Sequence, residues 1–143
     1  MIKSEDVEKI ALSIQEMESA EIAARLGDEI ADQFGPRDES GACIAARDPQ
    51  GVLVAGLNGV THWRWLYVRH LWVEPSRRGR GLGRRLMAEA ERLARGRGCV
   101  GIYIDTFDPL AAAFYEALGF TRAGEIVGFP PGHARLFLRK SLQ

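Results

Sequence analysis

The sequence predicts an α/β fold in which a mixed sheet carries helices on both faces, and three observations lead to that prediction. In the middle of the chain an apolar strand, a helix with an apolar stripe, a second strand and a second helix follow one another. Strand pairs joined by turn residues flank this unit on both sides. A length of 143 residues and a hydrophobic content of 46% are enough for a core, so we expect one domain spanning residues 1–143.

Residues 4–34 have the pattern of N-terminal helices. Apolar residues recur at helical spacing from Val7 to Ile14 and again from Ile22 to Ile30. A Gly-Pro pair directly after this range would end the helical region. The pattern leaves open whether one helix or two fills the range.

Turn residues divide the next part of the chain into strands. A turn sequence at 48–51 separates predicted strands at 41–47 and 52–60. A second turn, at 61–65, precedes the strand at 66–73, which leads into a glycine-rich loop.

Two helices and three strands are predicted for the second half of the chain. A helix over residues 82–95 has apolar side chains along one face and ends at glycines. A short apolar run at 100–104 predicts a buried strand. Asp108 then caps a second helix that begins with a proline. Closing strands are predicted at 120–126 and 134–140.

The glycine-rich loop has the features of a phosphate site. Its glycines let backbone N–H groups turn outward and let a ligand approach closely. The helix that follows offers unpaired N–H donors and the positive end of its dipole, and arginines add full charges. A nucleotide-triphosphate loop is excluded because no Gly-Lys-Ser/Thr follows, and the dinucleotide pattern fits poorly. The loop residues are Arg78, Gly79, Arg80, Gly81, Leu82 and Gly83.

Two motifs resemble those of the GNAT acyl-CoA-dependent N-acetyltransferases. The loop at 78–83 resembles the family's Arg/Gln-x-x-Gly-x-Gly/Ala sequence, and residues 114–120 resemble Phe/Leu-Tyr-Glu-x-x-Gly-Phe. The motifs lie about 32 residues apart, in the order that the family uses. The resemblance covers about residues 41–140. It implies a mixed, mostly antiparallel sheet splayed in the middle with helices on both faces, and an acetyl-CoA-binding core over about 66–120.

The resemblance also implies roles for individual residues. Acetyl-CoA would be the donor, its pyrophosphate held by the loop and its pantetheine by the backbone of Leu71, Trp72 and Val73. Tyr115 would be the general acid toward the leaving thiolate. Where the family commonly has Asn, this chain has Asp108, which we include among the expected cofactor contacts.

Several side chains are candidates for the base that accepts the proton of the acceptor amine. Glu74, at the end of a strand, is our first choice. A histidine is more often an ordinary, partly buried side chain than a base, so each histidine competes with that simpler explanation. Trp63, Trp65 and Tyr67 either line an acceptor pocket or pack within a hairpin. The other candidate bases are Asp105, His133, His62 and His70.

The composition of the chain limits the classes of partner that we expect it to bind. Lys+Arg and Asp+Glu both number 19, so the net charge is zero, whereas dedicated nucleic-acid binders carry a basic excess. Cys43 and Cys99 lie in apolar runs without metal-ligand spacing, which predicts buried thiols, a reducing compartment and no metal site. No stretch is long enough to span a membrane and no signal-peptide core opens the chain, so we expect a cytoplasmic protein without a membrane partner. An exposed sheet edge would allow a homodimer.

Three functions compete at this point. The first is acetyl transfer to an amine of a small molecule or a peptide, and the presence of Tyr115 favours it. The second is a non-catalytic acetyl-CoA-binding regulatory module on the same fold. The third is nucleic-acid binding through the arginines of residues 77–85, against which the neutral net charge counts. The acceptor stays open among polyamines, antibiotics, amino acids, protein N-termini and lysines.

Overall fold

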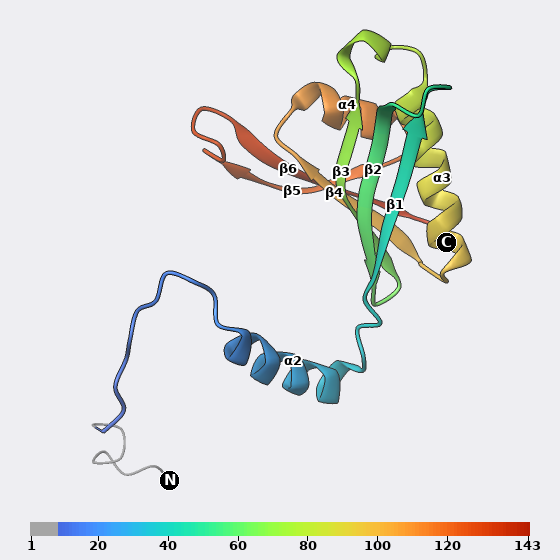
Figure 1. Cartoon of the computed structure of the whole chain (residues 1–143). Helices are drawn as coiled ribbons and strands as arrows, with labels where there is room; N and C mark the ends of the chain where they lie inside the picture. Colours follow the sequence, from blue (N-terminus) through green and yellow to red (C-terminus); the bar gives the residue numbers. More distant parts are fainter. Residues whose placement is uncertain (1–8) are drawn as a thin grey trace. The chain divides into compact units, whose positions relative to one another are not determined.

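The computed structural model describes residues 9–143, which form one helix followed by a six-stranded sheet with two further α-helices (Figure 1). Contacts divide the chain into two units, Met1–Pro36 and Arg37–Gln143. The predicted α/β class with a mixed, mostly antiparallel sheet is confirmed. That residues 1–143 act as one domain stays a prediction.

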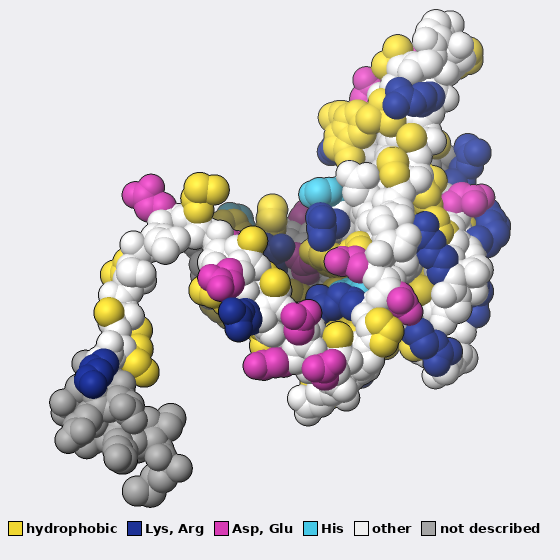
Figure 2. All heavy atoms as spheres, turned by 60° about the horizontal axis from the view of Figure 1, so that its bottom comes forward, with side chains coloured by type: hydrophobic (Ala, Val, Ile, Leu, Met, Phe, Trp, Pro, Cys, Tyr) yellow, Lys and Arg dark blue, Asp and Glu magenta, His cyan; other side chains and the backbone are white. Residues whose placement is uncertain are grey.

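In the first unit, α2 (Ala20–Phe34) is the described helix. Ser19 caps it by accepting a hydrogen bond from the Ile22 N–H at 3.2 Å. Acidic and hydrophobic side chains of this helix both reach the surface (Figure 2), and none of its residues is buried. The prediction of helix over residues 4–34 is therefore correct for this part of the range.

The same prediction is wrong for residues 10–19, which are not helical. Their large apolar side chains are mostly exposed, Ile14 completely so. A short helix without a packing partner is marginal in water, so apolar spacing alone does not maintain one. The start of the predicted range, including Val7, lies outside the described residues.

The second unit contains the sheet, whose strands follow the order β1-β2-β3-β4-β6-β5. All neighbouring strands are antiparallel except β3 and β4, which are parallel. The predicted strands are confirmed, with ends shifted by at most two residues. The strands are β1 (Ser40–Arg47), β2 (Leu53–His62), β3 (Trp65–Val73), β4 (Gly101–Thr106), β5 (Thr121–Val127) and β6 (Ala134–Ser141).

The turns between the first three strands follow from side-chain chemistry. Asp48 Oδ1 accepts hydrogen bonds from the N–H groups of Gln50 and Val52, each at 2.9 Å, which closes the first turn. The second turn contains only Trp63 and Arg64, both with positive φ. It is shorter than predicted because both flanking strands extend further toward it.

Helices α3 (Leu82–Gly96) and α4 (Pro109–Ala117) lie over the same face of the sheet and enclose the core. Both helices are confirmed within two residues of their predicted starts. We call this the covered face, and the opposite one the open face. Whether α2 supplies the helix predicted for the open face stays a prediction. The buried residues include Met87, Ala90 and Ala94 of α3, Ala112 and Tyr115 of α4, and Leu66, Val68, Ile102, Ile104, Leu136 and Leu138 of the strands.

A β-bulge at Arg69 changes which side chains of β3 face the core. Leu66 and Val68 point into the core, and the β2–β3 register then skips Arg69. As a result Leu71 and Val73, which pair with the buried residues of β2, lie on the covered face again. The sequence contains the signal for this bulge, because its apolar residues shift phase by one between Val68 and Leu71.

Gly59 makes room for the bulge. A Cβ at this position would lie 2.6 Å from the carbonyl oxygen of Tyr67, so only glycine permits this approach of β2 to β3.

The sheet opens directly after the bulge. The last pair between β3 and β4 is Val68 with Ile104. Beyond it β3 continues along β2, and β4 continues along β6, so that the two halves of the sheet diverge (Figure 1). The predicted splay in the middle of the sheet is therefore observed.

Candidate active site

The loop at 78–83 joins β3 to α3 through the short 3₁₀ helix η1 (Pro75–Arg77). Gly79 and Gly81 have φ of 76° and 84°, which glycine adopts without strain. Gly81 is also the N-cap of α3 and has no side chain to accept from the first N–H groups of the helix. These donors lie at the positive end of the helix dipole in an exposed loop, where an anion can reach them.

The third loop glycine and the first loop arginine serve the local packing. A Cβ at Gly83 would lie 3.3 Å from the ring of Phe114, so the bare backbone lets the start of α3 approach α4. Arg78 Nε donates to the carbonyl oxygen of Val73 at 2.9 Å and ties the loop to the end of β3. This bond uses one of the five N–H donors of the guanidinium group.

Beyond the sheet opening, β3 has an unpaired edge. Leu71, Trp72 and Val73 pair with β2, and within residues 9–143 no strand pairs with them on their β4 side. Alternate N–H and C=O groups of a strand point to each side, so this edge presents donors and acceptors to an extended ligand.

Tyr115, on α4, belongs to the core on the covered face. Its residue is 5% exposed, and its ring packs against Phe114 and Phe120 with centroid distances of 5.3 and 5.8 Å. Among residues 9–143 the Tyr115 hydroxyl has no hydrogen-bond partner. It is not fully enclosed, because His62 Nδ1 is the one side-chain nitrogen or oxygen of this range that is both buried and without a partner. The Tyr115 hydroxyl therefore contacts accessible space. Burial, and secondarily the negative charge of Asp105, raises the pKa of Tyr115 to about 12, so the hydroxyl is protonated at neutral pH.

Asp105 lies on the open face, one residue beyond the last pair of β3 with β4. Tyr67 Oη donates to Oδ1 at 2.5 Å, and Arg135 Nε donates to Oδ2 at 2.6 Å, with a further contact from the same guanidinium group. The Asp105 side chain is only 9% exposed. Burial, with the bond and charge of Asp105, raises the pKa of Tyr67. The structure thus brings a nearly buried carboxylate, a phenol and an arginine together beside the opening.

Aromatic side chains continue from this cluster along the open face. Tyr103 stacks on Tyr67 with ring centroids 4.8 Å apart, and its hydroxyl lies 2.7 Å from Nε2 of His62. Trp65 meets Tyr103 edge-on and extends over Gly101, where a Cβ would collide with the indole ring. His62 and Trp65 therefore pack within this row.

Glu74 lies farther from the opening than Asp105. Its carboxylate accepts from Arg77 Nε at 3.2 Å, and its backbone N–H donates to Val54. It follows the last pair of β3 with β4 by six residues, which is about 20 Å of extended strand. Its role as a base stays a prediction, and the geometry ranks Asp105 ahead of it.

The remaining candidate residues have structural contacts. Asp108 Oδ1 accepts from the Leu110 N–H at 2.9 Å, which confirms the predicted N-cap, while a contact with the cofactor stays a prediction. His70 lies 3.4 Å from the amide of Asn58. His133 is exposed in the β5–β6 turn, and the guanidinium group of Arg37 lies over the ring of Trp63.

A hollow of about 410 Å³ lies at the bulge, where Arg69 and His70 of β3 adjoin β2 and β1. We call it the bulge hollow. Cys43 lines it and is exposed, so the prediction of two buried thiols is wrong for this residue. The reason is that successive side chains of the edge strand β1 point to opposite faces of the sheet, and the Cys43 side chain lies on the open face. Cys99 is buried, as predicted. The other lining residues are Gly41, Ala42, Asn58 and Gly59.

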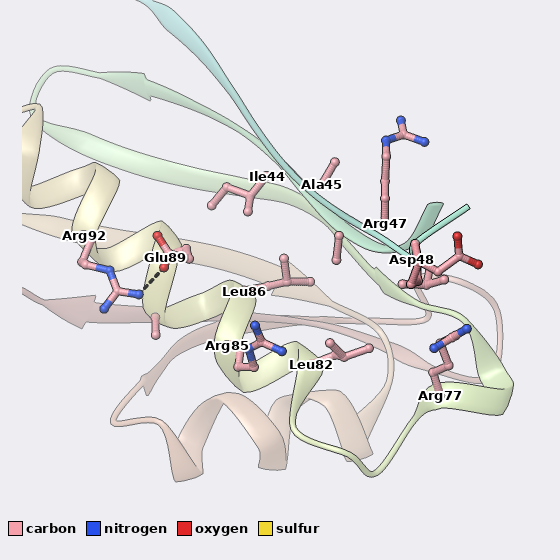
Figure 3. Close-up of a pocket in the computed structure, with 14 residues that line it drawn as sticks. Ile44, Ala45, Arg47, Asp48, Arg77, Leu82, Arg85, Leu86, Glu89 and Arg92 are labelled. Carbon is pink, nitrogen blue, oxygen red and sulfur yellow. Dashed lines mark hydrogen bonds and ion pairs between the residues drawn. The ribbon is translucent and has the colours of Figure 1, made fainter. Parts of the chain in front are cut away.

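A second groove, of about 670 Å³, lies between β1 and α3 (Figure 3). Leu82 and Leu86 of α3 face Ile44 of β1 across it. Three of its four arginines already have partners: Arg92 with Glu89, Arg77 with Glu74, and Arg47 with the carbonyl of Gly51. The fourth is Arg85. Two of the four guanidinium charges are therefore paired with carboxylates, while the bond of Arg47 to a carbonyl leaves its charge uncompensated.

Within residues 9–143 no three His, Cys, Asp or Glu side chains gather where they could hold a metal ion. No helix of this range is both long and apolar enough to cross a bilayer.

Comparisons with known proteins identify the family of this chain. The family model described as the acetyltransferase (GNAT) family matches residues 9–120. The chain belongs to the GNAT acetyltransferase family. It is therefore an acyltransferase enzyme, and the family uses acetyl-CoA as its donor.

Individual relatives agree with this membership. The chain is 40% identical over 108 residues to Acetyltransferase Atu2258 of Agrobacterium fabrum, covering 76% of this chain and 79% of that protein. It is 44% identical over 94 residues to Blasticidin-S acetyltransferase of Streptomyces morookaense, covering 65% of this chain and 69% of that protein.

Solved structures show the same fold. A crystal structure of a candidate acetyltransferase from Agrobacterium tumefaciens matches with a TM-score of 0.84 at 34% identity, covering 93% of this chain and 100% of that one. A candidate streptothricin acetyltransferase from Bacillus anthracis, solved in complex with acetyl coenzyme A, matches with a TM-score of 0.64 at 22% identity over 72% of this chain and 63% of that one.

Proposed function

We propose that this enzyme transfers the acetyl group of acetyl-CoA to a primary amine by direct attack. The observation that carries the proposal is the pair of polar side chains at the sheet opening. Tyr115 belongs to the core on the covered face and lies close enough to Asp105 to feel its charge, while Asp105 lies on the open face one residue beyond the last β3–β4 pair. A thioester held in the opening would have a proton donor on one side and a carboxylate on the other.

Acetyl-CoA would bind along the loop and the unpaired edge of β3. The N–H groups at the start of α3 would hold the pyrophosphate, and the edge at Leu71–Val73 would hold the pantetheine as an added strand. A backbone N–H of that edge would polarise the thioester carbonyl.

The Gly81→Glu variant tests this donor site, because it adds a side chain and a negative charge at the N-cap of α3. We expect the affinity for acetyl-CoA, measured by calorimetry, to fall by at least about tenfold, the loss of one charge-assisted hydrogen bond. The Gly27→Glu variant, on α2, is the matched control. Unchanged affinity in folded Gly81→Glu protein would remove the loop from the site.

In the reaction itself, the nitrogen lone pair of the free amine attacks the acetyl carbonyl carbon. The N–C bond forms, the C–S bond breaks and coenzyme A leaves as a thiolate. The surplus proton on nitrogen passes to the Asp105 carboxylate, directly or through water.

Tyr115 would assist the departing sulfur chiefly as a hydrogen-bond donor. Its pKa of about 12 keeps the hydroxyl protonated. A free thiol has a pKa of about 8.5, so complete proton transfer from this phenol to the thiolate is unfavourable. A hydrogen bond to the developing negative charge still stabilises the transition state.

A screen for released coenzyme A thiol with a broad amine library tests the proposal. We expect at least one amine to be acetylated, and Asp105→Asn to lower kcat/KM by about 10²-fold or more, as expected for loss of a general base. Thermal unfolding and acetyl-CoA affinity show whether Asp105→Asn protein is intact.

Tyr67→Phe provides a second variant, because it removes one bond to the carboxylate and leaves its charge. We expect a smaller loss of kcat/KM than in Asp105→Asn. Wild-type kinetics in both variants would exclude Asp105 as the base.

A further inference from the structure

We infer that the acceptor amine also carries a carboxylate, which lies in the bulge hollow against Arg69. This inference rests on the proposed function and assigns the chemical class of its acceptor. Three features of the open face support it: the balance of charge around Asp105, the lining of the hollow, and the position of Tyr67 between them.

The charge beside the opening is not balanced. Asp105 is the acidic member of the cluster, and Arg135 pairs with it. Arg69 remains, because among residues 9–143 it has no ion pair or hydrogen bond, and its guanidinium carbon lies 5.8 Å from the ring centroid of Tyr67. An acceptor with a second ammonium group would be repelled here, whereas one with an anionic group would be attracted.

The lining of the bulge hollow suits a small anion. No acidic side chain lines it, and its polar members are the guanidinium group of Arg69, the amide of Asn58 and the imidazole of His70. All three can donate hydrogen bonds to a carboxylate. The remaining lining residues are small, which leaves about 410 Å³ of space open to solvent.

Tyr67 connects this hollow to the carboxylate of the reaction. Its hydroxyl donates to Asp105 at 2.5 Å, and Arg69 lies over its ring. The Asp105 carboxylate, which would accept the proton of the amine, and the Arg69 guanidinium group therefore lie on either side of the Tyr67 phenol. Because Arg69 is the extra residue of the bulge, the same distortion that opens the sheet also sets the position of this cation.

The test compares amino carboxylates with their uncharged amides. We would measure release of coenzyme A thiol with β-alanine, γ-aminobutyrate and 6-aminohexanoate, each beside its amide, so that spacer length varies and size is matched. For at least one length we expect kcat/KM to favour the carboxylate by about 10- to 100-fold, the range of a charge-assisted hydrogen bond.

Two arginine variants then test whether Arg69 causes the preference for the carboxylate over the amide. Arg69→Gln should remove the preference for the carboxylate while leaving turnover of the amides close to wild type. Arg92→Gln removes the same charge from α3, which lies over the covered face, and should leave the preference intact. Retention of the preference in folded Arg69→Gln protein would overturn the assignment to this residue.

The outcomes separate this inference from the proposed function. Acetylation of amides or polyamines without any preference for carboxylates overturns the inference and leaves amine acetylation standing. Failure of every amine in the library, with protein that binds acetyl-CoA, overturns the proposed function and the inference together.

Discussion

The two faces of the sheet in residues 37–143 contain alternate side chains of the same strands, and they differ in almost every property. The covered face under α3 and α4 is apolar, with Ile102 and Leu138 essentially without exposed surface. The open face carries the row from Trp65 through Asp105, whose members bond to one another. Stability therefore resides mainly on one face, and polar chemistry on the other.

Two tyrosines make the contrast concrete. Tyr115 is buried on the covered face, and its hydroxyl is without a partner among the described residues. Tyr67 lies on the open face, and its hydroxyl is bound to Asp105. A hydroxyl without a hydrogen-bond partner is available to a ligand, whereas a hydroxyl that donates to Asp105 fixes the position of that carboxylate. The comparison supports the proposal that Tyr115 acts on the substrate and that Tyr67 positions Asp105.

Tyr115→Phe should give the largest effect. It keeps the ring and its packing and removes only the hydroxyl, so kcat and kcat/KM should fall together by about 10²–10³-fold, the loss typical of removing one hydrogen-bond donor to a developing negative charge. Acetyl-CoA affinity and thermal unfolding serve as internal controls and should barely change. Unchanged turnover, with chemistry shown to be rate-limiting, would leave this tyrosine with a packing role only.

The neighbouring pair Leu138 and Arg139 tests the contrast in stability. Leu138 is 1% exposed on the covered face, while Arg139 is exposed on the open face. Leu138→Ala should lower the free energy of unfolding by about 2–5 kcal/mol, whereas Arg139→Ala should change it by about 0.5 kcal/mol or less. Urea titration measures both. Equal losses would show that the open face contributes to the core as much as the covered one.

Alkaline pH should reveal the burial of Tyr115. Its pKa is raised from 10.0 to about 12, so the folded state favours the neutral phenol. The resulting stability is complete below pH 10 and is lost as pH rises toward 12, by at most about 2.7 kcal/mol. Phenylalanine has no group to ionise, so wild type should become less stable than Tyr115→Phe by up to this amount over the interval. A constant difference across pH 10–12 would contradict the buried, neutral hydroxyl.

Glu74→Gln should have the smallest effect. The carboxylate is paired with Arg77 at the far end of β3, so we expect kcat/KM and its pH profile to stay within about twofold of wild type. Asp105→Asn, measured under the same conditions, provides the comparison. A large loss in Glu74→Gln would restore Glu74 as the first candidate base and demote Asp105.

Local sequence patterns were sufficient for most elements of the fold. Asp48 and Asp108 accept the backbone N–H bonds that begin a turn and a helix, and such bonds depend only on residues nearby in the chain. The loop glycines at 79 and 81 adopt the positive φ that their residue type allows. The same reasoning failed at residues 10–19, because helical spacing without packing does not stabilise a helix.

The candidate site depended on contacts between distant segments. Asp105, Tyr67 and Arg135 come from three strands, and only their register brings them together. Asp105 was among the candidate bases, but nothing in the sequence ranked it above Glu74. Arg135 was not singled out, since an arginine in a closing strand has no local signature.

The sequence by itself therefore determined the element order, the turns and caps, the loop and the position of Tyr115 on its helix, because each depends on short-range geometry. The tertiary structure decided where along β3 the sheet opens. The bulge at Arg69 shifts the alternation of one strand, and the pairing with β4 stops beside it. A one-residue change of phase moves every later side chain to the other face, so its consequences appear only once strands from distant parts of the chain are paired.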